Sequence, residues 1–233
     1  MKYCIVVKNG EKIYSKNDTK IVALNKINIK FEENKIYVIM GNSGAGKSTL
    51  LQNIGLLDNL TSGDIIIDGT HISKMTEKEK ANIRRDKIGF IFQSFYLNPY
   101  MKAYENVMLP LLLNKSLTNA DKKEKAIKLL NEVGLKDRIN HFPKELSGGE
   151  QQRVAIARSL ANGPKIILAD EPTGNLDRKN EELIMKIFKK LKNHNKCIII
   201  VSHNEKIKEY ADEVIYMKDG NIYYEDLWYH ENL

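Results

Sequence analysis

Cysteine, proline and tryptophan are scarce in this sequence of 233 residues, which holds two, five and one of them respectively. Cys4 and Cys197 stand far apart and form no CxxC pair, which argues against a disulfide framework and against a cysteine metal site. We interpret both cysteines as reduced packing residues. Internal repeats, low-complexity tracts and flexible linkers are also lacking, so we expect one compact unit.

Long apolar runs are missing too. A membrane-spanning helix needs about 18 or more apolar residues in succession, whereas the most apolar stretch here, 107–113, contains Pro110. The N-terminal sequence MKYCIVVKNG lacks the long apolar core and the small-residue cleavage site of a secretory signal. We therefore expect a cytoplasmic chain that crosses no membrane itself.

The net charge of +7 admits two interpretations. A basic chain can bind nucleic acid or an anionic membrane surface. Lysine, however, is spread through nearly every segment, which is typical of a compositional bias of the whole chain rather than of a focused patch. We therefore expect no nucleic-acid partner.

Short apolar segments predict three buried strands, at 35–40, 165–169 and 197–201. A helical pattern at 49–57 follows the first strand, and another at 181–194 separates the other two. Strands that alternate with helices predict the α/β class, with a parallel sheet covered on both faces.

Two further segments predict antiparallel hairpins, because Asp-Gly pairs follow apolar strands there. They are 64–67 with Asp68-Gly69, and 214–217 with Asp219-Gly220 before 222–224. Between roughly 95 and 161 the strand signals vanish and helical patterns dominate. We expect a helical insertion in the α/β core.

Residues 41–48, GNSGAGKS, match the phosphate-loop pattern G-x-x-x-x-G-K-[ST] between a predicted strand and a predicted helix. The glycines let backbone N–H groups wrap the phosphates, and the helix N-terminus points its positive end at them. Lys47 would place a positive charge at the β- and γ-phosphate oxygens, and the Ser48 hydroxyl can ligate Mg²⁺. A chance match in such a chain has a probability on the order of one in a hundred, so the motif predicts nucleotide binding.

Two adjacent carboxylates, Asp170 and Glu171, follow the predicted strand at 165–169. Ligands of parallel sheets bind at this end of the strands. Asp170 fits a residue that organises Mg²⁺, and Glu171 fits a base that polarises an attacking water. Alone, such a pair is more often a turn or a helix cap, but the phosphate loop upstream favours a site.

The sequence LSGGE at 146–150 stands just before a predicted helix. Its serine hydroxyl, its glycine amides and the helix dipole together can bind an anion. In isolation the same pattern is an ordinary capped helix start.

These motifs occur in one order: the phosphate loop, Gln93, LSGGE with QQRVAIARSLA, LADEPTGNLD, and a strand that ends in Ser202-His203. In this order they resemble the ABC nucleotide-binding domain, over residues 2 to about 224. The resemblance implies a P-loop NTPase with a RecA-like core, an antiparallel β subdomain and an inserted α-helical signature subdomain. We accordingly predict a core lobe at 1–94 and 162–225, a helical signature subdomain at 95–161, and a tail at 226–233.

The resemblance also implies an ATPase that uses ATP and Mg²⁺. In that family the signature of one subunit, here Ser147, Gly148, Gly149 and Glu150, caps the γ-phosphate bound by the other subunit. A homodimer that closes on ATP is therefore expected, in which each site needs both chains. Two positions depart from the commoner pattern: Glu150 replaces Gln, and Ser94 stands where many relatives have a second Gln.

Further roles carry over by position from the resemblance. Tyr14 resembles the aromatic residue that stacks on adenine, Gln93 the glutamine that senses Mg²⁺ and the γ-phosphate, and Asp177 the aspartate that communicates across the dimer. His203 resembles the switch histidine that contacts the γ-phosphate and positions the catalytic water. The ordinary alternatives are a surface-packed Tyr14 and a structural His203. The full set of predicted ATP contacts is Tyr14, Gly41, Asn42, Ser43, Gly44, Ala45, Gly46, Lys47, Ser48, Thr49, Gln93, Ser147, Gly148, Gly149, Glu150 and Asp177. Catalysis is expected from Lys47, Gln93, Glu171 and His203, and Mg²⁺ ligation from Ser48, Gln93 and Asp170.

The strings IRRDKIGFIFQSFYLNP and ADEPTGNLD resemble the branch of macrolide and peptide exporters, lipoprotein-release complexes and antimicrobial-peptide resistance transporters. That resemblance implies a separate membrane permease, which selects the transported molecule and holds the ATPase on the inner face of the cell membrane. Export of, or resistance to, a peptide, antibiotic or lipophilic substrate is the expected role. An ABC ATPase of cell-division signalling or of soluble iron–sulfur assembly is the alternative.

Apolar and aromatic residues gather directly after Gln93, at 95–100 and 107–113. Such a cluster forms either part of a core or a docking surface. We predict that Phe95, Tyr96 and Leu97 dock the permease, while packing inside the helical subdomain stays the competing interpretation.

Overall fold

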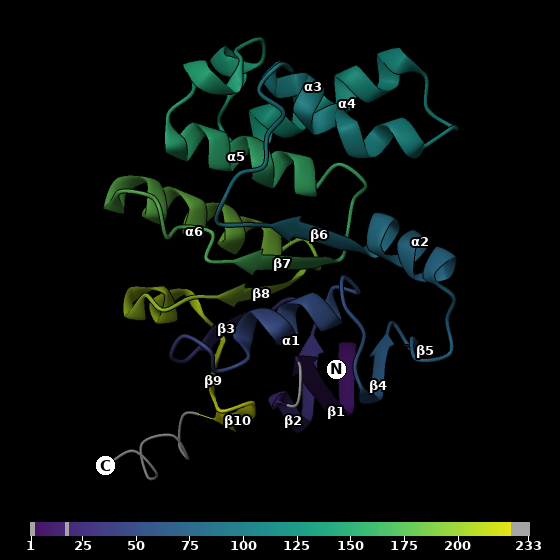
Figure 1. The fold of residues 1–233 in the computed structure, drawn as a ribbon. Coiled ribbons are helices and arrows are strands. Elements are labelled where there is room, and N and C mark those ends of the chain that lie inside the picture. The colour runs from purple at the N-terminus through teal and green to yellow at the C-terminus, as the bar shows by residue number, and fades with distance from the viewer. Residues whose placement is uncertain (1–2, 17–18, 225–233) are drawn as a thin grey trace.

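The computed structural model describes residues 3–16 and 19–224, which form two β-sheets with helices packed on and between them (Figure 1). The strands are β1 (Tyr3–Lys16), β2 (Thr19–Glu32), β3 (Ile36–Met40), β4 (Ser62–Ile67), β5 (Thr70–His71), β6 (Ile88–Ile91), β7 (Ile166–Asp170), β8 (Cys197–Val201), β9 (Glu213–Lys218) and β10 (Asn221–Tyr224). The α-helices are α1 (Lys47–Ile54), α2 (Glu77–Lys87), α3 (Ala103–Met108), α4 (Asn119–Glu132), α5 (Gly148–Ser159) and α6 (Arg178–Lys192). Short 3-10 helices are η1 (Leu109–Leu113), η2 (Lys136–Arg138), η3 (Pro143–Glu145) and η4 (Glu205–Tyr210). The predicted tail at 226–233 lies outside the described residues.

The first sheet is antiparallel, with the strand order β2-β1-β4-β5. The residue pattern does not predict its two longest strands, β1 and β2, which only the family resemblance implies. The predicted turn after β4 is present: Asp68 and Gly69 have φ of 47° and 77°, and Ile67 pairs with Thr70. Positive φ at both central residues is the geometry of a tight hairpin turn.

The second sheet has the order β10-β9-β3-β8-β7-β6, and all its pairs are parallel except β10 with β9. The predicted strands at 35–40, 165–169 and 197–201 correspond to β3, β7 and β8. The antiparallel edge is also confirmed, because β9 and β10 form a hairpin around Asp219 and Gly220.

Strand β3 is buried on both faces of this sheet. Tyr37 and Ile39 belong to the core that the sheet shares with β1 and β2, whereas Ile36, Val38 and Met40 belong to the core formed with α3, α4, α5 and α6. Alternate side chains of a strand point to opposite faces, so a strand covered on both sides is apolar throughout.

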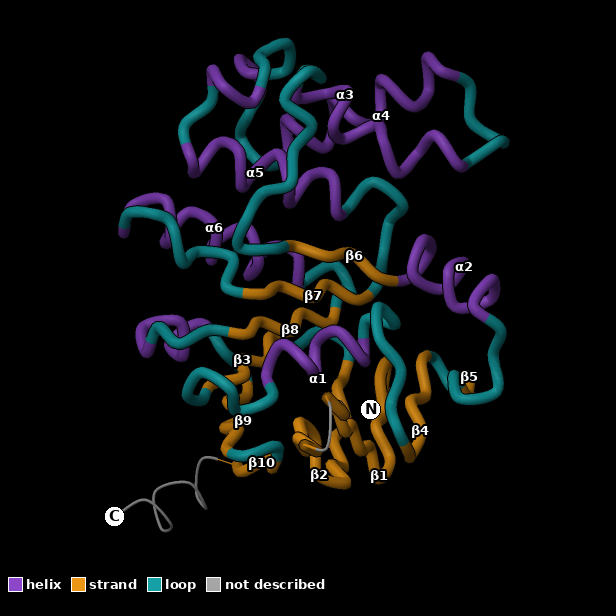
Figure 2. Tube along the Cα trace, in the orientation of Figure 1, coloured by secondary structure: helices purple, strands orange, loops and turns teal. Residues whose placement is uncertain are grey.

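Helix α1 lies between the two sheets, as Figures 1 and 2 show. Its Leu50, Leu51 and Ile54 are buried in the core that contains residues of β1, β2, β3, β7 and β8. Packing from both sides fixes the N-terminal end of α1, where the phosphate loop joins it.

Between β6 and β7 the regular elements are all helices: α3, η1, α4, η2, η3 and α5. They lie at the opposite end of the molecule from the first sheet (Figure 1). Val107, Leu130 and Ile156 are fully buried and belong to the same core as Val38 of β3 and Ile198 of β8, so the helices pack onto one face of the parallel sheet. Within residues 3–16 and 19–224, no helix is both long and apolar enough to span a bilayer.

Cys4 and Cys197 are free and fully buried, in agreement with the packing role expected for both. A hydrogen bond between the two side chains and the burial of the site raise the pKa of Cys197 well above its ordinary value. The thiol form is therefore favoured at neutral pH.

Candidate active site

The phosphate loop connects the buried end of β3 to the first turn of α1. Gly46 occupies the N-cap of α1 with φ of 101°, a left-handed conformation that favours glycine. A Cβ atom at Gly46 would also lie 2.3 Å from the carbonyl oxygen of Ala23. The loop can therefore keep this shape against β2 only with glycine at position 46.

Lys47 starts helix α1 and folds its side chain back over the loop. Its Nζ donates hydrogen bonds to the carbonyl oxygens of Gly41, at 2.7 Å, and Asn42, at 2.9 Å. The positive charge therefore stays at the mouth of the loop, next to the amides that can bind phosphate oxygens.

Ser48 and Asp170 meet across the loop and the end of β7. The Ser48 hydroxyl donates a hydrogen bond to Asp170 Oδ1 at 3.2 Å. Burial raises the pKa of Asp170, and the hydrogen bond from Ser48 opposes that shift. A hydroxyl and a carboxylate supply hard oxygen ligands of the kind that Mg²⁺ uses together with substrate phosphates and water.

Glu171 follows Asp170 in a left-handed backbone conformation, with φ of 47°. Its N–H donates to the carbonyl oxygen of Val201 at 2.9 Å, which ties this turn to the neighbouring strand β8. On the side chain, Oε1 lies 2.8 Å from Nδ1 of His203, and Oε2 accepts a hydrogen bond from the Ser202 hydroxyl at 3.3 Å. The carboxylate is thereby oriented by two groups from the end of β8, an arrangement suited to a general base.

One cavity of about 560 Å³ collects most of the predicted residues. Its lining includes Gly41, Asn42, Ser43, Gly44, Ala45, Gly46, Lys47, Ser48, Thr49, Gln93, Asp170, Glu171 and His203. Gln93 also donates from Nε2 to Asn175 Oδ1 at 3.3 Å, which connects it to the segment after the two carboxylates.

The remaining predicted residues lie outside this cavity lining. Tyr14 is 39% exposed on β1 and donates its hydroxyl to Asp58 Oδ2 at 2.8 Å, while Ile21, Val22 and Ala23 of β2 line that side of the cavity. The adenine-stacking role of Tyr14 stays a prediction.

Ser147 is the N-cap of α5 and forms a reciprocal capping box with Glu150. Asp177 is the N-cap of α6, where its Oδ1 accepts the amide of Asn180 at 2.8 Å. Neither Ser147 nor Asp177 lines the phosphate-loop cavity of its own chain. The predicted site is therefore divided between separate surfaces of the molecule.

Comparison with known proteins decides the family. The model of the ABC transporter family matches residues 24–174, well over half of the chain. The chain belongs to the ABC transporter family. This confirms the family that the motif order indicates.

Relatives cover nearly the whole cassette. An uncharacterized ABC transporter ATP-binding protein of Methanocaldococcus jannaschii is 50% identical over 94% of this chain and 97% of its own. The macrolide export ATP-binding/permease protein MacB of Bdellovibrio bacteriovorus is 46% identical over 94% of this chain, which spans only 33% of that protein. A dimeric ATP-binding cassette solved in a post-hydrolysis state with ADP and Pi is 42% identical, with a TM-score of 0.86 over 94% of this chain and 96% of its own. The chain is thus an ATP-binding, ATP-hydrolysing cassette with the predicted fold class.

Two residues connect the site to the helical part of the cassette. The sequence motifs do not single them out. Gln152 of α5 is fully buried, and its Nε2 donates to the carbonyl oxygens of Phe92, at 3.3 Å, and Pro172, at 2.6 Å. It thereby joins the segment before Gln93 to the segment after Glu171. The position of Gln152 two residues after the LSGGE motif is the only sequence signal that could have found it.

Arg158, also on α5, holds the segment that follows Gln93. Its guanidinium donates to the carbonyl oxygens of Tyr96, at 2.5 Å, and Phe95, at 2.8 Å. These two hydrogen bonds tie the segment to α5.

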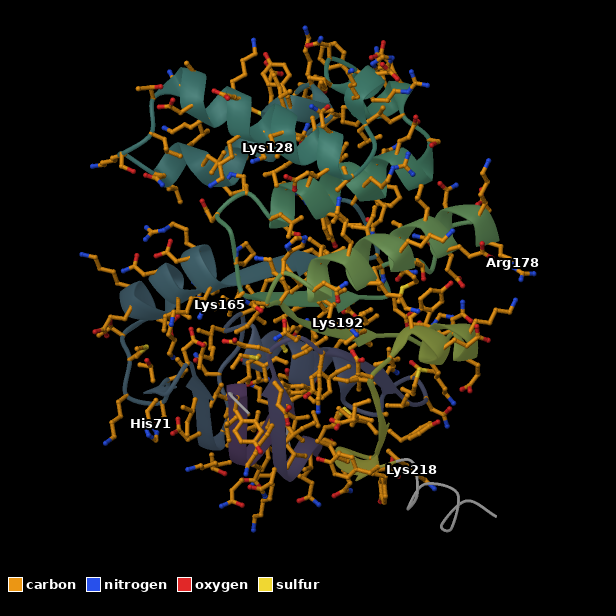
Figure 3. All side chains as sticks on the ribbon, turned by 180° about the vertical axis from the view of Figure 1, so that it is seen from behind. His71, Lys128, Lys165, Arg178, Lys192 and Lys218 are labelled. Carbon is orange, nitrogen blue, oxygen red and sulfur yellow. The ribbon has the colours of Figure 1, made fainter. Side chains whose placement is uncertain are left out.

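The basic side chains of the cassette are widely distributed. Figure 3 shows Lys128 on the helical part, Lys165 and Lys192 beside the parallel sheet, and Lys218 near the first sheet. Lys192 forms an ion pair with Asp212 at 2.9 Å, and Lys165 lies 3.7 Å from Glu33. The charge is spread over the elements as the sequence suggests.

Proposed function

We propose that two copies of the cassette close head to tail around two Mg-ATP molecules and that hydrolysis reopens them. The observation that carries this proposal is the separation of the signature residues from the phosphate-loop cavity within one chain. An anion-binding helix start that lies outside its own chain's ATP cavity is available to the ATP held by a second copy. The dimeric state of the similar cassette with ADP and Pi supports this assignment.

The residues that line the cavity have different roles in ATP hydrolysis. The loop amides and Lys47 hold the phosphates, and Glu171, oriented by Ser202 and His203, takes up a proton from the attacking water. Mg²⁺, when bound, neutralises charge on the β- and γ-phosphate oxygens. Ser48 and Asp170 are the protein groups that would hold it, with Gln93 on the same cavity wall.

The magnesium assignment predicts that Asp170→Asn raises the Mg²⁺ concentration needed for half-maximal ATPase activity by at least about tenfold, because a neutral amide attracts the cation far less than a carboxylate does. ATPase rates measured over a Mg²⁺ titration check this. Asp86→Asn, on a carboxylate of α2 whose side chain is 55% exposed, is the control for a general loss of charge. An unchanged Mg²⁺ midpoint in Asp170→Asn would assign the metal to other ligands.

We also propose that the cassette serves a separate integral-membrane permease, which would hold it in the cytoplasm, peripherally, on the inner face of the cell membrane. The ATP-binding/permease relative supports the pairing of such a cassette with a membrane path. The proposed cargo class is a peptide, an antibiotic or another lipophilic molecule, and the permease would select it.

The surface after Gln93 is the proposed docking site. Tyr96 is 69% exposed and Tyr100 is 89% exposed, whereas Val107 and Leu111 are fully buried. Part of the apolar cluster is thus core, as the competing interpretation holds, and part is free to contact a partner. Arg158 of α5 donates a hydrogen bond to the backbone of this segment. A partner bound here would therefore contact a segment that is attached to α5.

The docking proposal predicts that Tyr96→Ser with Tyr100→Ser lowers the fraction of cassette bound to its permease by at least about tenfold, because exposed aromatic anchors dominate many interfaces. The measurement is co-purification with the integral membrane protein encoded beside it. ATP binding and ATP-driven dimerisation of the variant should survive. Tyr3→Ser, which removes a tyrosine 41% exposed on the first sheet, is the matched control.

Two results would count against this assignment. Permease binding that withstands the double substitution would move docking to another surface. Failure of the unaltered cassette to bind any integral membrane protein would favour the alternative of a non-transport ABC ATPase.

A further inference from the structure

The signature helix carries a negative charge at the end that is proposed to receive an anion. Glu150 lies in the first turn of α5, three residues after Ser147. Its Oε2 accepts the backbone N–H of Ser147 at 2.8 Å, so the carboxylate is held directly over the N-cap. In exchange, the Ser147 hydroxyl oxygen accepts the N–H of Glu150 at 3.3 Å, which completes a reciprocal capping box.

A carboxylate at a helix N-terminus stabilises the helix, but it repels a second anion at the same place. A glutamine could make the same capping hydrogen bond without the charge. Glu150 therefore creates an electrostatic problem for γ-phosphate binding that the commoner glutamine does not.

Arg138, in η2, lies against this carboxylate. Its Nε donates to Glu150 Oε1 at 2.8 Å, and the side chain of Glu150 is only 19% exposed. Partial burial favours the neutral acid, but the hydrogen bonds from Arg138 and Ser147 prevail and lower the pKa of Glu150 to about 2. The carboxylate is thus fully ionised at neutral pH, and a cation sits beside it.

A second arginine, Arg153, interacts with the charge of Glu150, but its hydrogen bond goes to another element. Arg153 is one helical turn beyond Glu150 and is 8% exposed, and its Nη1 lies 3.4 Å from Asn180 Oδ1 on α6. The direct ionic partner of Glu150 among the described residues is therefore Arg138.

We propose that Arg138 is a positioning residue for the signature: it neutralises Glu150 and holds that side chain over Ser147, so that the start of α5 can accept the γ-phosphate bound by a second copy. This inference rests on the proposed function, because it concerns the signature's half of the shared site. The phosphate-loop half, which Arg138 does not touch, should bind nucleotide independently of it.

The test uses the Glu171→Gln protein and measures its ATP-driven dimerisation by sedimentation over an ATP titration. Adding Arg138→Gln, which removes the charge, should raise the ATP concentration for half-dimerisation by about tenfold, because an unpaired carboxylate then faces the γ-phosphate. Adding Glu150→Gln as well should restore the midpoint to within about twofold. Binding of a fluorescent ATP analogue to the monomer should be the same in all three proteins.

The rescue separates charge neutralisation from simple structural support. If Arg138→Gln has no effect, or if its defect persists with Glu150→Gln, Arg138 does not act through the charge of Glu150 and the inference is overturned. If the Glu171→Gln protein itself stays monomeric at saturating ATP, the shared-site proposal fails, and this inference fails with it for a different, recognisable reason. Thermal unfolding of each variant identifies any loss of folding, and Glu150→Gln alone provides the folded reference.

Discussion

We expect Lys47→Ala to abolish ATP turnover and to weaken nucleotide binding greatly. The side chain is the one cation that the loop holds at its mouth, within 2.9 Å of two loop carbonyl oxygens. Its loss removes a positive charge from beside the β- and γ-phosphate oxygens, so we expect the rate to fall by at least about 10²-fold. Steady-state ATPase assays and equilibrium binding of a fluorescent ATP analogue measure the two effects.

A matched control is Lys128→Ala, which removes an exposed lysine on α4, far from the cavity (Figure 3). It should hydrolyse ATP at the unaltered rate. Turnover at the unaltered rate in Lys47→Ala would show that the measured activity belongs to another protein in the preparation.

Glu171→Gln lowers the hydrolysis rate by a factor on the order of 10²–10⁴. The amide keeps the size of the carboxylate and can still contact Ser202 and His203, but it cannot accept the proton of the attacking water. Because binding groups stay in place, ATP affinity should be retained. Single-turnover hydrolysis with excess protein isolates the chemical step from product release.

Glu124→Gln is the matched control, since it makes the same substitution at an exposed carboxylate on α4, outside the cavity. It should not reproduce the loss of the chemical step. A Glu171→Gln protein that hydrolyses ATP within a few-fold of the unaltered rate would transfer the role of base to another residue, and Asp170 would be the first to replace.

The sequence predicts best where apolar periodicity and turn chemistry agree. Strands β3 and β8 are uninterrupted apolar runs, and β7 is one up to Asp170, because these strands are buried on both faces; the sequence alone therefore predicts them. The hairpins at Asp68-Gly69 and Asp219-Gly220 are equally visible, since these pairs tolerate positive φ.

The elements that the residue pattern misses carry weaker signals. In β2 the buried Ile27, Ile29 and Phe31 alternate with exposed Asn28 and Lys30, so the signal of this strand is a period of two residues rather than an apolar run. Helix α2 buries only Lys80, so it has no apolar stripe to reveal it. Its capping box at Thr76 and Glu79 is the signal that could have predicted it.

Like the fold, the functional site has parts that the local sequence predicts and parts that it does not. Contiguous motifs predict where the phosphate loop and the two carboxylates lie in the fold, because β3 and β7 lead directly into them. Contacts between distant segments, such as Gln152 with Pro172 or Arg158 with Phe95, depend on packing that no local pattern encodes. The ion pair of Arg138 with Glu150 belongs to this second kind, although only 12 positions separate the two residues.

The central claim is that each ATP site is shared by two chains, and sedimentation velocity of Glu171→Gln tests it most directly. With saturating ATP and Mg²⁺ the protein should sediment as a dimer, without nucleotide as a monomer, and with ATP as a monomer again when Ser147→Arg blocks the signature. A monomer at saturating ATP would contradict the account, and so would a dimer that persists in the Ser147→Arg variant.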